Sequence, residues 1–241
     1  MKKIWITFLL AGCVGTNWQM PADFVYVPIQ TPDYEIATWQ KISNPKNDKI
    51  HIYIEGDGNS FDSRGQPTDD PTPRGTFLRE TVVQDGAENV VYVARPCQFI
   101  MSENCSQTDW TTGRFSQKII DAESAVVKQI AGNKKVTLIG YSGGAMVSGL
   151  IIKQNPDLKV EKWVTIAGVL NHENWTSYFG DKPLSDSLDL DDLPKIAQVH
   201  FIGGKDDVVS PGLVTTWADA KNVKIVPNAK HDDFGDFKIF D

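Results

Sequence analysis

The sequence predicts an α/β fold with a doubly wound, mostly parallel sheet that begins with an antiparallel hairpin. Short apolar runs of strand length alternate along the chain with longer segments whose apolar residues recur at helical spacing. Such alternation is typical of a parallel sheet that is covered by helices on both faces. The 241 residues, 41% of them hydrophobic, are enough for one well-buried domain. The net charge of −7 argues against a nucleic-acid partner, because nucleic-acid-binding proteins normally carry a basic patch.

The predicted elements follow one another in the order that this fold requires. Residues 24–29 and 34–40 are expected to pair as the hairpin, because Thr31-Pro32-Asp33 between them is a turn sequence. Apolar runs predict the remaining strands at 50–55, 90–94, 136–139, 162–167, 197–202 and 223–226. Helices are predicted at 76–84, 116–130, 143–154 and 212–220. Residues 168–194 are expected to be rich in loops and to form at most a small cap.

The first residues of the chain predict export. Met1-Lys2-Lys3 is basic, and the apolar run that follows, residues 4–10, is too short to span a bilayer. This pattern is typical of a cleavable signal peptide, here over residues 1–12. Residues 13–21 are then expected to be a tether, and residues 22–241 a single domain.

The end of this signal resembles the lipobox of bacterial lipoproteins. The matching residues are Leu10-Ala11-Gly12-Cys13. The resemblance implies that Cys13 is lipid-modified and anchors the protein to a membrane of the bacterial cell envelope, on its periplasmic or outer-membrane side. The alternative is a plain secretory signal with an incidental cysteine.

The two remaining cysteines are expected to form a disulfide. Cys97 and Cys105 flank a short loop, and export brings the chain into an oxidising compartment. The competing interpretation is a metal site. We do not predict a metal site, because no histidine stands near these cysteines at ligand spacing.

The stretch Gly140-Tyr141-Ser142-Gly143-Gly144 carries the clearest chemistry. It follows an apolar strand and opens a helix, which is the arrangement of a nucleophile elbow with the G-x-S-x-G motif. Glycines on either side of Ser142 leave room for a turn that exposes its hydroxyl above the sheet edge. The motif predicts a serine nucleophile, and therefore a serine hydrolase.

Such a serine needs a base and an acid in the order Ser, Asp or Glu, His. Asp206 follows the strand 197–202, at the edge where parallel sheets place functional residues, and Asp207 is the alternative acid. His231 follows the strand 223–226 and is the only histidine after the acid. We therefore predict Ser142, Asp206 and His231 as the catalytic residues.

Further residues are expected at the same edge. The oxyanion hole is predicted from the N–H groups of Gly143 and Asp57, with Gly58 as the second choice in the loop after strand 50–55. Four residues are candidates for contact with the substrate: Gly58, Trp110, Arg114 and His172. Arg114 would bind a carboxylate, with Arg95 nearby, although a structural ion pair is an equal alternative. His172 is expected to line the pocket, with an alternative role as the base.

Beyond these motifs the chain resembles the α/β-hydrolase superfamily over nearly all of its mature length. Five blocks resemble more narrowly a group of exported bacterial serine hydrolases: residues 56–58, 70–74, 94–97, 109–114 and 172–176. The resemblance implies an exported serine hydrolase and implies no substrate. Many relatives carry His-Gly where this chain has Glu55-Gly56, so the oxyanion loop departs from the pattern.

We therefore expect an envelope-anchored enzyme that cleaves small carboxylic esters through an acyl-enzyme. No metal or organic cofactor is expected. A peptidase or transacylase of the same fold and a non-catalytic binding lipoprotein are the alternatives. The oligomeric state stays open.

Overall fold

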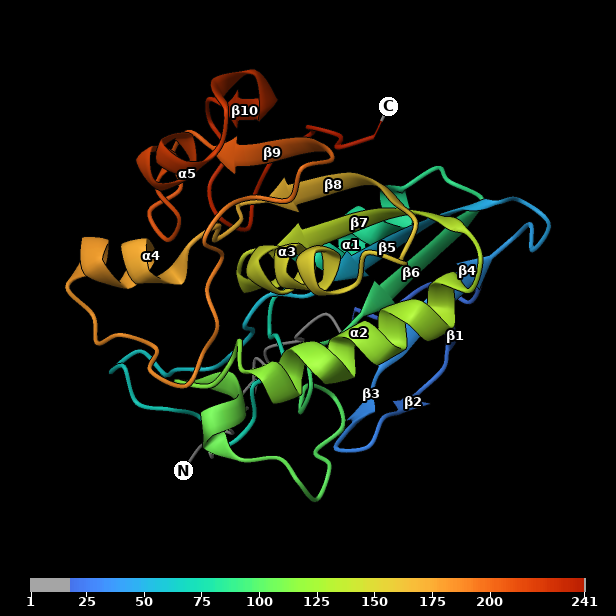
Figure 1. Ribbon diagram of the computed structural model, residues 1–241, viewed down its shortest axis with the longest axis horizontal. Coiled ribbons are helices and arrows are strands. Elements are labelled where there is room, and N and C mark those ends of the chain that lie inside the picture. Colours follow the sequence, from blue (N-terminus) through green and yellow to red (C-terminus); the bar gives the residue numbers. More distant parts are fainter. Residues whose placement is uncertain (1–17, 241) are drawn as a thin grey trace, which may run out of the picture.

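A computed structural model describes residues 18–240. At its centre is an eight-stranded sheet with the strand order β1-β4-β6-β5-β7-β8-β9-β10 (Figure 1). Its strands are β1 (Val25–Tyr26), β4 (Thr38–Ile42), β5 (Lys49–Ile54), β6 (Asn89–Val93), β7 (Lys135–Tyr141), β8 (Val160–Ile166), β9 (Ala197–Gly203) and β10 (Val223–Val226). From β6 to β10 all neighbours are parallel, whereas β4 runs antiparallel to both β1 and β6. The predicted mostly parallel sheet is therefore confirmed.

The predicted hairpin is present, but each of its strands is divided in two. The inner halves, β2 (Ile29–Gln30) and β3 (Glu35–Ile36), form a separate two-stranded sheet, while β1 pairs with β4 in the main sheet. Pro28 stands between β1 and β2 and has no N–H for a ladder, which explains the interruption.

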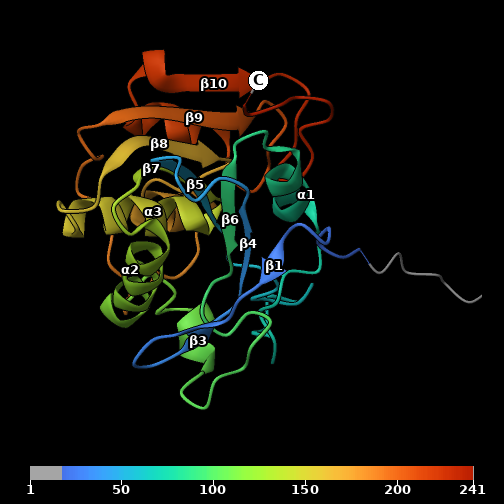
Figure 2. The same cartoon turned by 90° about the vertical axis from the view of Figure 1, so that its right-hand side faces the viewer.

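Helices cover both faces of the main sheet (Figures 1 and 2). They are α1 (Phe77–Gln84), α2 (Gln117–Ala131), α3 (Gly143–Gln154), α4 (His172–Phe179) and α5 (Pro211–Trp217), with short 3₁₀ helices η1 (Gln107–Trp110) and η2 (Ala220–Asn222). Residues of α2, α3 and α5 belong to one apolar core, and residues of α1 belong to a second core, which also contains Phe234 of the C-terminal segment. The sheet therefore separates two apolar layers, as a doubly wound fold requires.

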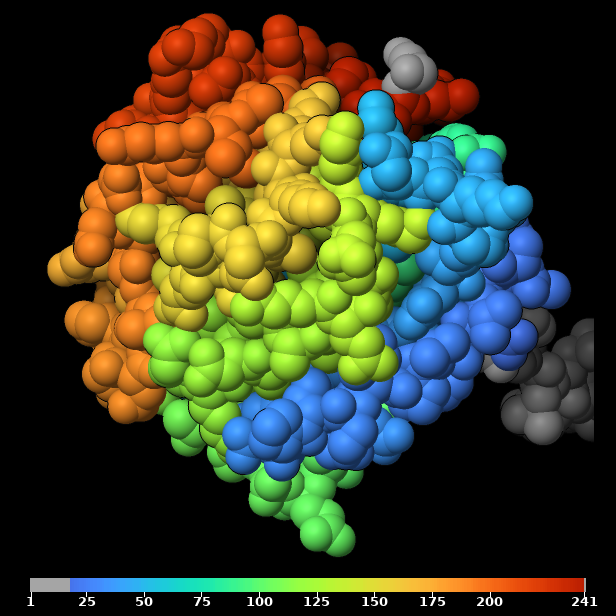
Figure 3. All heavy atoms as spheres, turned by 45° about the vertical axis from the view of Figure 1, so that its right-hand side comes forward, coloured from blue at the N-terminus to red at the C-terminus, as the bar shows by residue number. Residues whose placement is uncertain are grey.

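The helix α2 forms because its apolar residues recur at helical spacing. Ile119, Ile120, Val126 and Val127 are fully buried in the first core. Burial of such side chains stabilises the fold by roughly 1.5–3 kcal/mol each. The space-filling view shows the N-terminal segment, in blue, lying against this helix (Figure 3).

The segment 168–194 is rich in loops, as expected, but it also contains the helix α4, which the sequence analysis did not predict. Asn171 is its N-cap and accepts a hydrogen bond from the N–H of Asn174, and Gly180 ends it in a left-handed conformation with φ 71°. The rest of this segment, all of which the structure describes, is irregular. This short helix lies beside the carboxyl end of the sheet (Figure 1).

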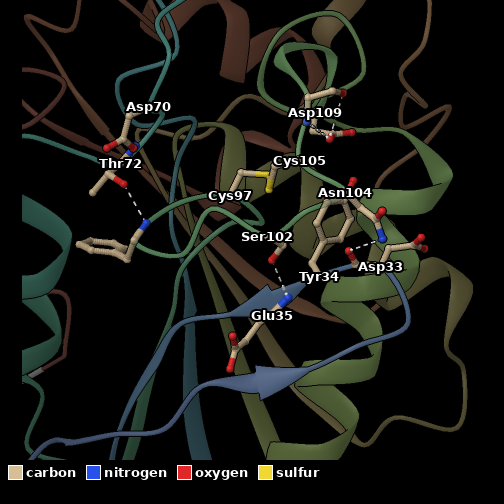
Figure 4. The surroundings of a disulfide bond; sticks show 12 residues. Asp33, Tyr34, Glu35, Asp70, Thr72, Cys97, Ser102, Asn104, Cys105 and Asp109 are labelled. Carbon is tan, nitrogen blue, oxygen red and sulfur yellow. Dashed lines mark hydrogen bonds between the residues drawn. A yellow bond between two sulfur atoms is a disulfide. The ribbon is translucent and has the colours of Figure 1, made fainter.

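Cys97 and Cys105 are joined by a disulfide, as predicted, with their Cα atoms 5.8 Å apart. The loop that it closes is tied to the N-terminal hairpin (Figure 4). Ser102 Oγ accepts a hydrogen bond of 2.9 Å from the N–H of Glu35, and the side chain of Asn104 donates one of 3.3 Å to Asp33 O. The disulfide therefore fixes a loop that connects two distant parts of the chain.

The expected signal peptide and Cys13 lie outside the described residues, as does the first part of the expected tether. Among residues 18–240, no helix is both long enough and apolar enough to span a membrane.

Candidate active site

Ser142 lies in the sharp turn between β7 and α3. Its backbone has φ 51° and ψ −123°, a conformation that costs a non-glycine residue about 1–3 kcal/mol. Its N–H donates to Ile166 O over 3.0 Å, and its carbonyl accepts from the N–H of Val169 over 3.1 Å. These bonds hold the turn in the geometry that the G-x-S-x-G motif predicts.

Close packing explains the two glycines of the motif. A Cβ on Gly140 would clash with Gly144 O and Ser148 Oγ. A Cβ on Gly144 would clash with Ile54 O at the end of β5. Only glycine therefore allows α3 to begin so close to the neighbouring strands.

Ser142, His231 and Asp206 form one chain of hydrogen bonds. Nε2 of His231 is 3.0 Å from Ser142 Oγ, and Nδ1 is 3.0 Å from Asp206 Oδ2. The three side chains come from β7, β9 and β10, each shortly after the strand ends. Parallel strands that are neighbours in the sheet bring their carboxyl ends together, so the predicted edge position is what unites these residues.

The structure distinguishes Asp206 from its alternative, Asp207. Asp206 is 5% exposed, and its Oδ1 accepts hydrogen bonds from the N–H groups of Val208 and Val209 over 2.9 and 2.7 Å. Asp207 is exposed and makes no contact with His231 among the described hydrogen bonds. The main chain therefore orients Asp206 toward the histidine.

The loop after β5 lies against the nucleophile. A Cβ on Gly56 would be 3.0 Å from the Cβ of Ser142, and a Cβ on Gly143 would clash with the carboxylate of Asp57. As the first residue of α3, Gly143 has an N–H without a partner inside the helix. The N–H of Asp57 donates to no other described residue. Gly143 and Asp57 therefore lie close to Ser142, and the N–H group of neither donates to another described residue.

Glu55 stands where the resemblance leads one to expect histidine. Its side chain is buried and accepts hydrogen bonds from Tyr92 Oη over 2.7 Å and from the N–H of Gly56 over 2.9 Å. Burial raises the pKa of this carboxyl. Glu55 therefore holds the start of the oxyanion loop from inside the protein.

A network of charged residues surrounds Asp57. Arg114 Nη1 is 2.7 Å from Asp57 Oδ2, and Arg95 Nη1 is 3.4 Å from Oδ1. Arg95 Nε also lies 3.4 Å from Glu123 Oε1, and the guanidinium donates to Arg114 O. Burial raises the pKa of Glu123 to about 8, although Arg95 acts in the opposite direction. Two guanidinium groups therefore share the carboxylate of Asp57, and burial favours the neutral form of Glu123, the second acid of the network.

A cavity of about 430 Å³ opens above Ser142 and His231. This volume is typical of sites for small molecules. Apolar side chains line much of it, among them Phe61, Phe115, Val169, Trp175, Leu184 and Val208. The cavity can therefore take a small, partly apolar group next to the serine.

The candidate substrate contacts divide into two groups. Gly58, Arg114 and His172 line the cavity. Trp110 does not line it: this side chain is 6% exposed, packs in the core and donates a hydrogen bond of 3.1 Å from Nε1 to Thr68 O. The prediction that Trp110 lies at the site is thus corrected.

The sequence interpretation missed Tyr141 as part of the cavity wall. Tyr141, next to the nucleophile, lies with its ring 5.4 Å from the His231 ring. Trp175 of α4 lines the cavity and donates from Nε1 to Val208 O over 2.8 Å. The asparagine N-cap and the glycine after Phe179 were the signals that could have revealed α4 and its inner face.

No group of three or more His, Cys, Asp or Glu side chains within residues 18–240 is arranged to hold a metal ion.

No protein-family model and no curated protein matches this sequence. Solved structures do match. An α/β serine hydrolase without a lid from Xanthomonas campestris is 15% identical, covers 90% of this chain and 89% of its own, and has a TM-score of 0.52. An esterase from Pyrococcus furiosus is 20% identical over 89% of this chain and 88% of its own, with a TM-score of 0.58. The chain has the α/β-hydrolase fold.

A third solved structure has the same fold. A serine hydrolase from a Cycloclasticus bacterium is 11% identical over 86% of this chain and 90% of its own, with a TM-score of 0.55. The expected fold class is therefore confirmed by topology and by likeness to solved structures.

Proposed function

We propose that this protein is a serine hydrolase that cleaves carboxylic esters. The observation that carries the proposal is the chain of hydrogen bonds from Asp206 through His231 to Ser142, with the serine in a strained turn. Retention of this geometry has no evident purpose in a protein that only binds. The likeness to solved esterases and serine hydrolases supports the same reaction class.

The proposed reaction has two acyl-transfer steps. His231 Nε2 takes the proton from Ser142 Oγ as the oxygen attacks the ester carbonyl. The N–H groups of Gly143 and Asp57 stabilise the oxyanion. His231 then gives the proton to the departing alcohol, and the acyl group stays on Ser142. His231 then takes a proton from a water molecule as the water oxygen attacks the acyl-enzyme. The bond to Ser142 Oγ breaks, the carboxylic acid is released, and His231 gives the proton back to the serine oxygen.

The function of Asp206 is to orient His231 and to stabilise its charged form. Its Oδ1 is already held by two main-chain N–H groups, so the carboxylate has little freedom to rotate. We therefore assign it an orienting function and expect no net proton transfer to it.

Labelling with a fluorophosphonate, followed by an ester assay, tests the proposal. Purified wild type should be labelled covalently and should hydrolyse p-nitrophenyl esters of short acids. A folded Ser142→Ala variant should show no label, and its kcat should fall by about 10³-fold or more. If the folded wild type neither reacts with the probe nor turns over esters, the hydrolase proposal is wrong. A peptide and acceptor-alcohol screen on the active enzyme would separate an esterase from a peptidase or a transacylase.

We further propose that the enzyme is anchored in the bacterial cell envelope through Cys13. The support is the signal-like segment before it and the lipobox resemblance. Cells fed an alkyne fatty acid should yield labelled wild type in the membrane fraction, whereas Cys13→Ser should be unlabelled. Unlabelled wild type would indicate a plain secretory signal.

A further inference from the structure

Two polar side chains in the cavity wall have hydrogen-bonding capacity that the described residues do not use. His172 is 6% exposed, and its two ring nitrogens, which are sealed from solvent, have no hydrogen-bond partner among residues 18–240. Asp189 Oδ2, the nearest acid, is 3.7 Å from Nδ1, beyond hydrogen-bond distance. Buried polar groups normally have partners, so such an exception calls for an explanation.

Arg114 also has an N–H donor that no described residue uses. Its Nε donates to Thr111 O over 2.8 Å and its Nη1 to Asp57 Oδ2 over 2.7 Å. Nη2 donates to no described residue, and it is not among the atoms sealed from solvent. Because Arg114 lines the cavity, this edge of the guanidinium is available to a bound molecule.

The two side chains belong to one wall of the cavity. Phe115 follows Arg114 in the chain, and its ring is stacked on the imidazole of His172 with centroids 5.7 Å apart and an angle of 20°. Arg114 also contacts Asp57, whose carboxylate lies against Gly143. The wall therefore adjoins the proposed oxyanion hole, where the reacting carbonyl would sit.

The charges at this wall favour an anion. Arg95 and Arg114 share the single carboxylate of Asp57, and burial raises the pKa of Glu123, the other acid of the network, to about 8. Two other charged residues that line the cavity, Arg74 and Asp232, have opposite signs. Glu55 also lines it, but burial raises the pKa of this carboxyl, which favours its neutral form.

We infer that Arg114 and His172 form a subsite for a carboxylate on the acyl part of the substrate. This inference rests on the proposed ester hydrolysis. The acyl side is assigned because the wall adjoins Asp57 and Gly143, the proposed oxyanion donors, whereas the leaving oxygen must lie at His231. The preferred substrates are then monoesters of short dicarboxylic acids, with the distal carboxylate paired to Arg114 beside the imidazole of His172.

A matched pair of esters tests the inference. p-Nitrophenyl hydrogen glutarate and p-nitrophenyl valerate have similar length and the same leaving group, and only the first carries a carboxylate. The wild-type kcat/KM should be at least about tenfold higher for the glutarate ester, as expected for charge-assisted hydrogen bonds. Both esters use the same nucleophile and oxyanion hole. A variant that impairs the catalytic residues therefore lowers both kcat/KM values and leaves their ratio unchanged.

Two variants test which residues cause the preference for the glutarate ester. Arg114→Gln should lower the ratio about tenfold or more, and His172→Phe, which keeps an aromatic ring on Phe115, should lower it severalfold. Arg64→Gln is the control, since Arg64 is exposed and, among residues 18–240, forms an ion pair only with Asp62 in its own loop. A wild-type ratio near one overturns the inference. So does a ratio that Arg114→Gln leaves unchanged while both rates fall, because Arg114 would then only position Asp57.

A binding measurement is independent of turnover. Glutarate should raise the Tm of Ser142→Ala more than valerate does at equal concentration, and Arg114→Gln in that background should remove the difference. If the wild type fails to hydrolyse either ester but this difference is present, the hydrolase proposal fails and the subsite stands. If the difference is absent, the subsite is rejected.

Discussion

At the scale of single residues, the site depends on glycines, which have no side chain and so let charged groups approach the nucleophile. Gly143 is the clearest case, because the carboxylate of Asp57 occupies the space that any side chain at this position would need. Asp57 is in turn held by Arg95 and Arg114. One added methyl group would therefore disturb both proposed oxyanion donors together.

Gly143→Ala should lower kcat by about 10²–10³-fold, the cost typical of losing an oxyanion donor. The fold should remain, because the clash is confined to one loop. Steady-state kinetics and circular dichroism check both parts. Gly86→Ala is a matched control, since a Cβ there meets no atom within 4 Å. Full activity in Gly143→Ala would show that the loop position of Asp57 is not needed.

Glu123 gives a prediction about stability and pH. Burial raises its pKa from 4.5 to about 8, so in this window the folded protein keeps a proton that the unfolded chain releases. The contribution of this group to stability is therefore fully present below about pH 4.5 and is lost as the pH rises through about 8. The slope should be up to about 1.4 kcal/mol per pH unit.

Glu123→Gln should remove this slope. The free energy of unfolding of wild type and variant should be measured by urea titration at several pH values between about 5 and 9. Glu103→Gln, in the exposed part of the disulfide loop, should keep the wild-type dependence. Parallel curves for wild type and Glu123→Gln would mean that Arg95 keeps Glu123 ionised in the fold.

At the scale of elements, local sequence signals located the strands and the site residues at their carboxyl ends. Ser142, Asp206 and His231 were predictable because each follows an apolar run and the order of the three is fixed by the elbow motif. The contacts of Asp57 were not predictable, because its partners Arg95 and Arg114 are 38 and 57 positions away in the chain. Trp110 was misplaced for the same reason, since nothing local indicates that its indole turns toward Thr68.

Loss of the disulfide should lower the stability of the fold. It closes a loop with a sequence separation of 8 and ties it to the N-terminal hairpin. Replacing both cysteines by serine should destabilise the fold by about 2–3 kcal/mol. Urea unfolding of the Cys97→Ser/Cys105→Ser variant measures this, with reduced wild type as the comparison. An unchanged midpoint would show that the hydrogen bonds of the loop hold it without the crosslink.

At the scale of the whole molecule, the alternation of strands and helices was enough to predict the architecture, because a parallel sheet leaves few ways to connect its strands. The division of the hairpin and the helix α4 lay beyond that pattern. Pro28 interrupts the first strand of the hairpin, and Asn171 and Gly180 cap α4 at its two ends. The residues that precede Trp18 carry the proposed anchor, and chemistry on cells must test it.

The place of the acid and the base in the sheet has a further consequence. Asp206 and His231 follow β9 and β10, and β10 is a four-residue strand at the edge with Ile225 half exposed. Edge strands open more readily than central ones. Activity should therefore be lost on heating before the far-ultraviolet circular dichroism changes, and should return on cooling. Coincident midpoints for the two signals would contradict this.

Activity would then depend on temperature over a range in which most of the fold is still intact. Hydrolysis would cease while the nucleophile still sat in an intact elbow on β7, and fluorophosphonate reactivity would fade in step with the fraying of the last two strands. Substitutions on the solvent side of β10 would then shift the working temperature of the enzyme without altering the chemistry of its site.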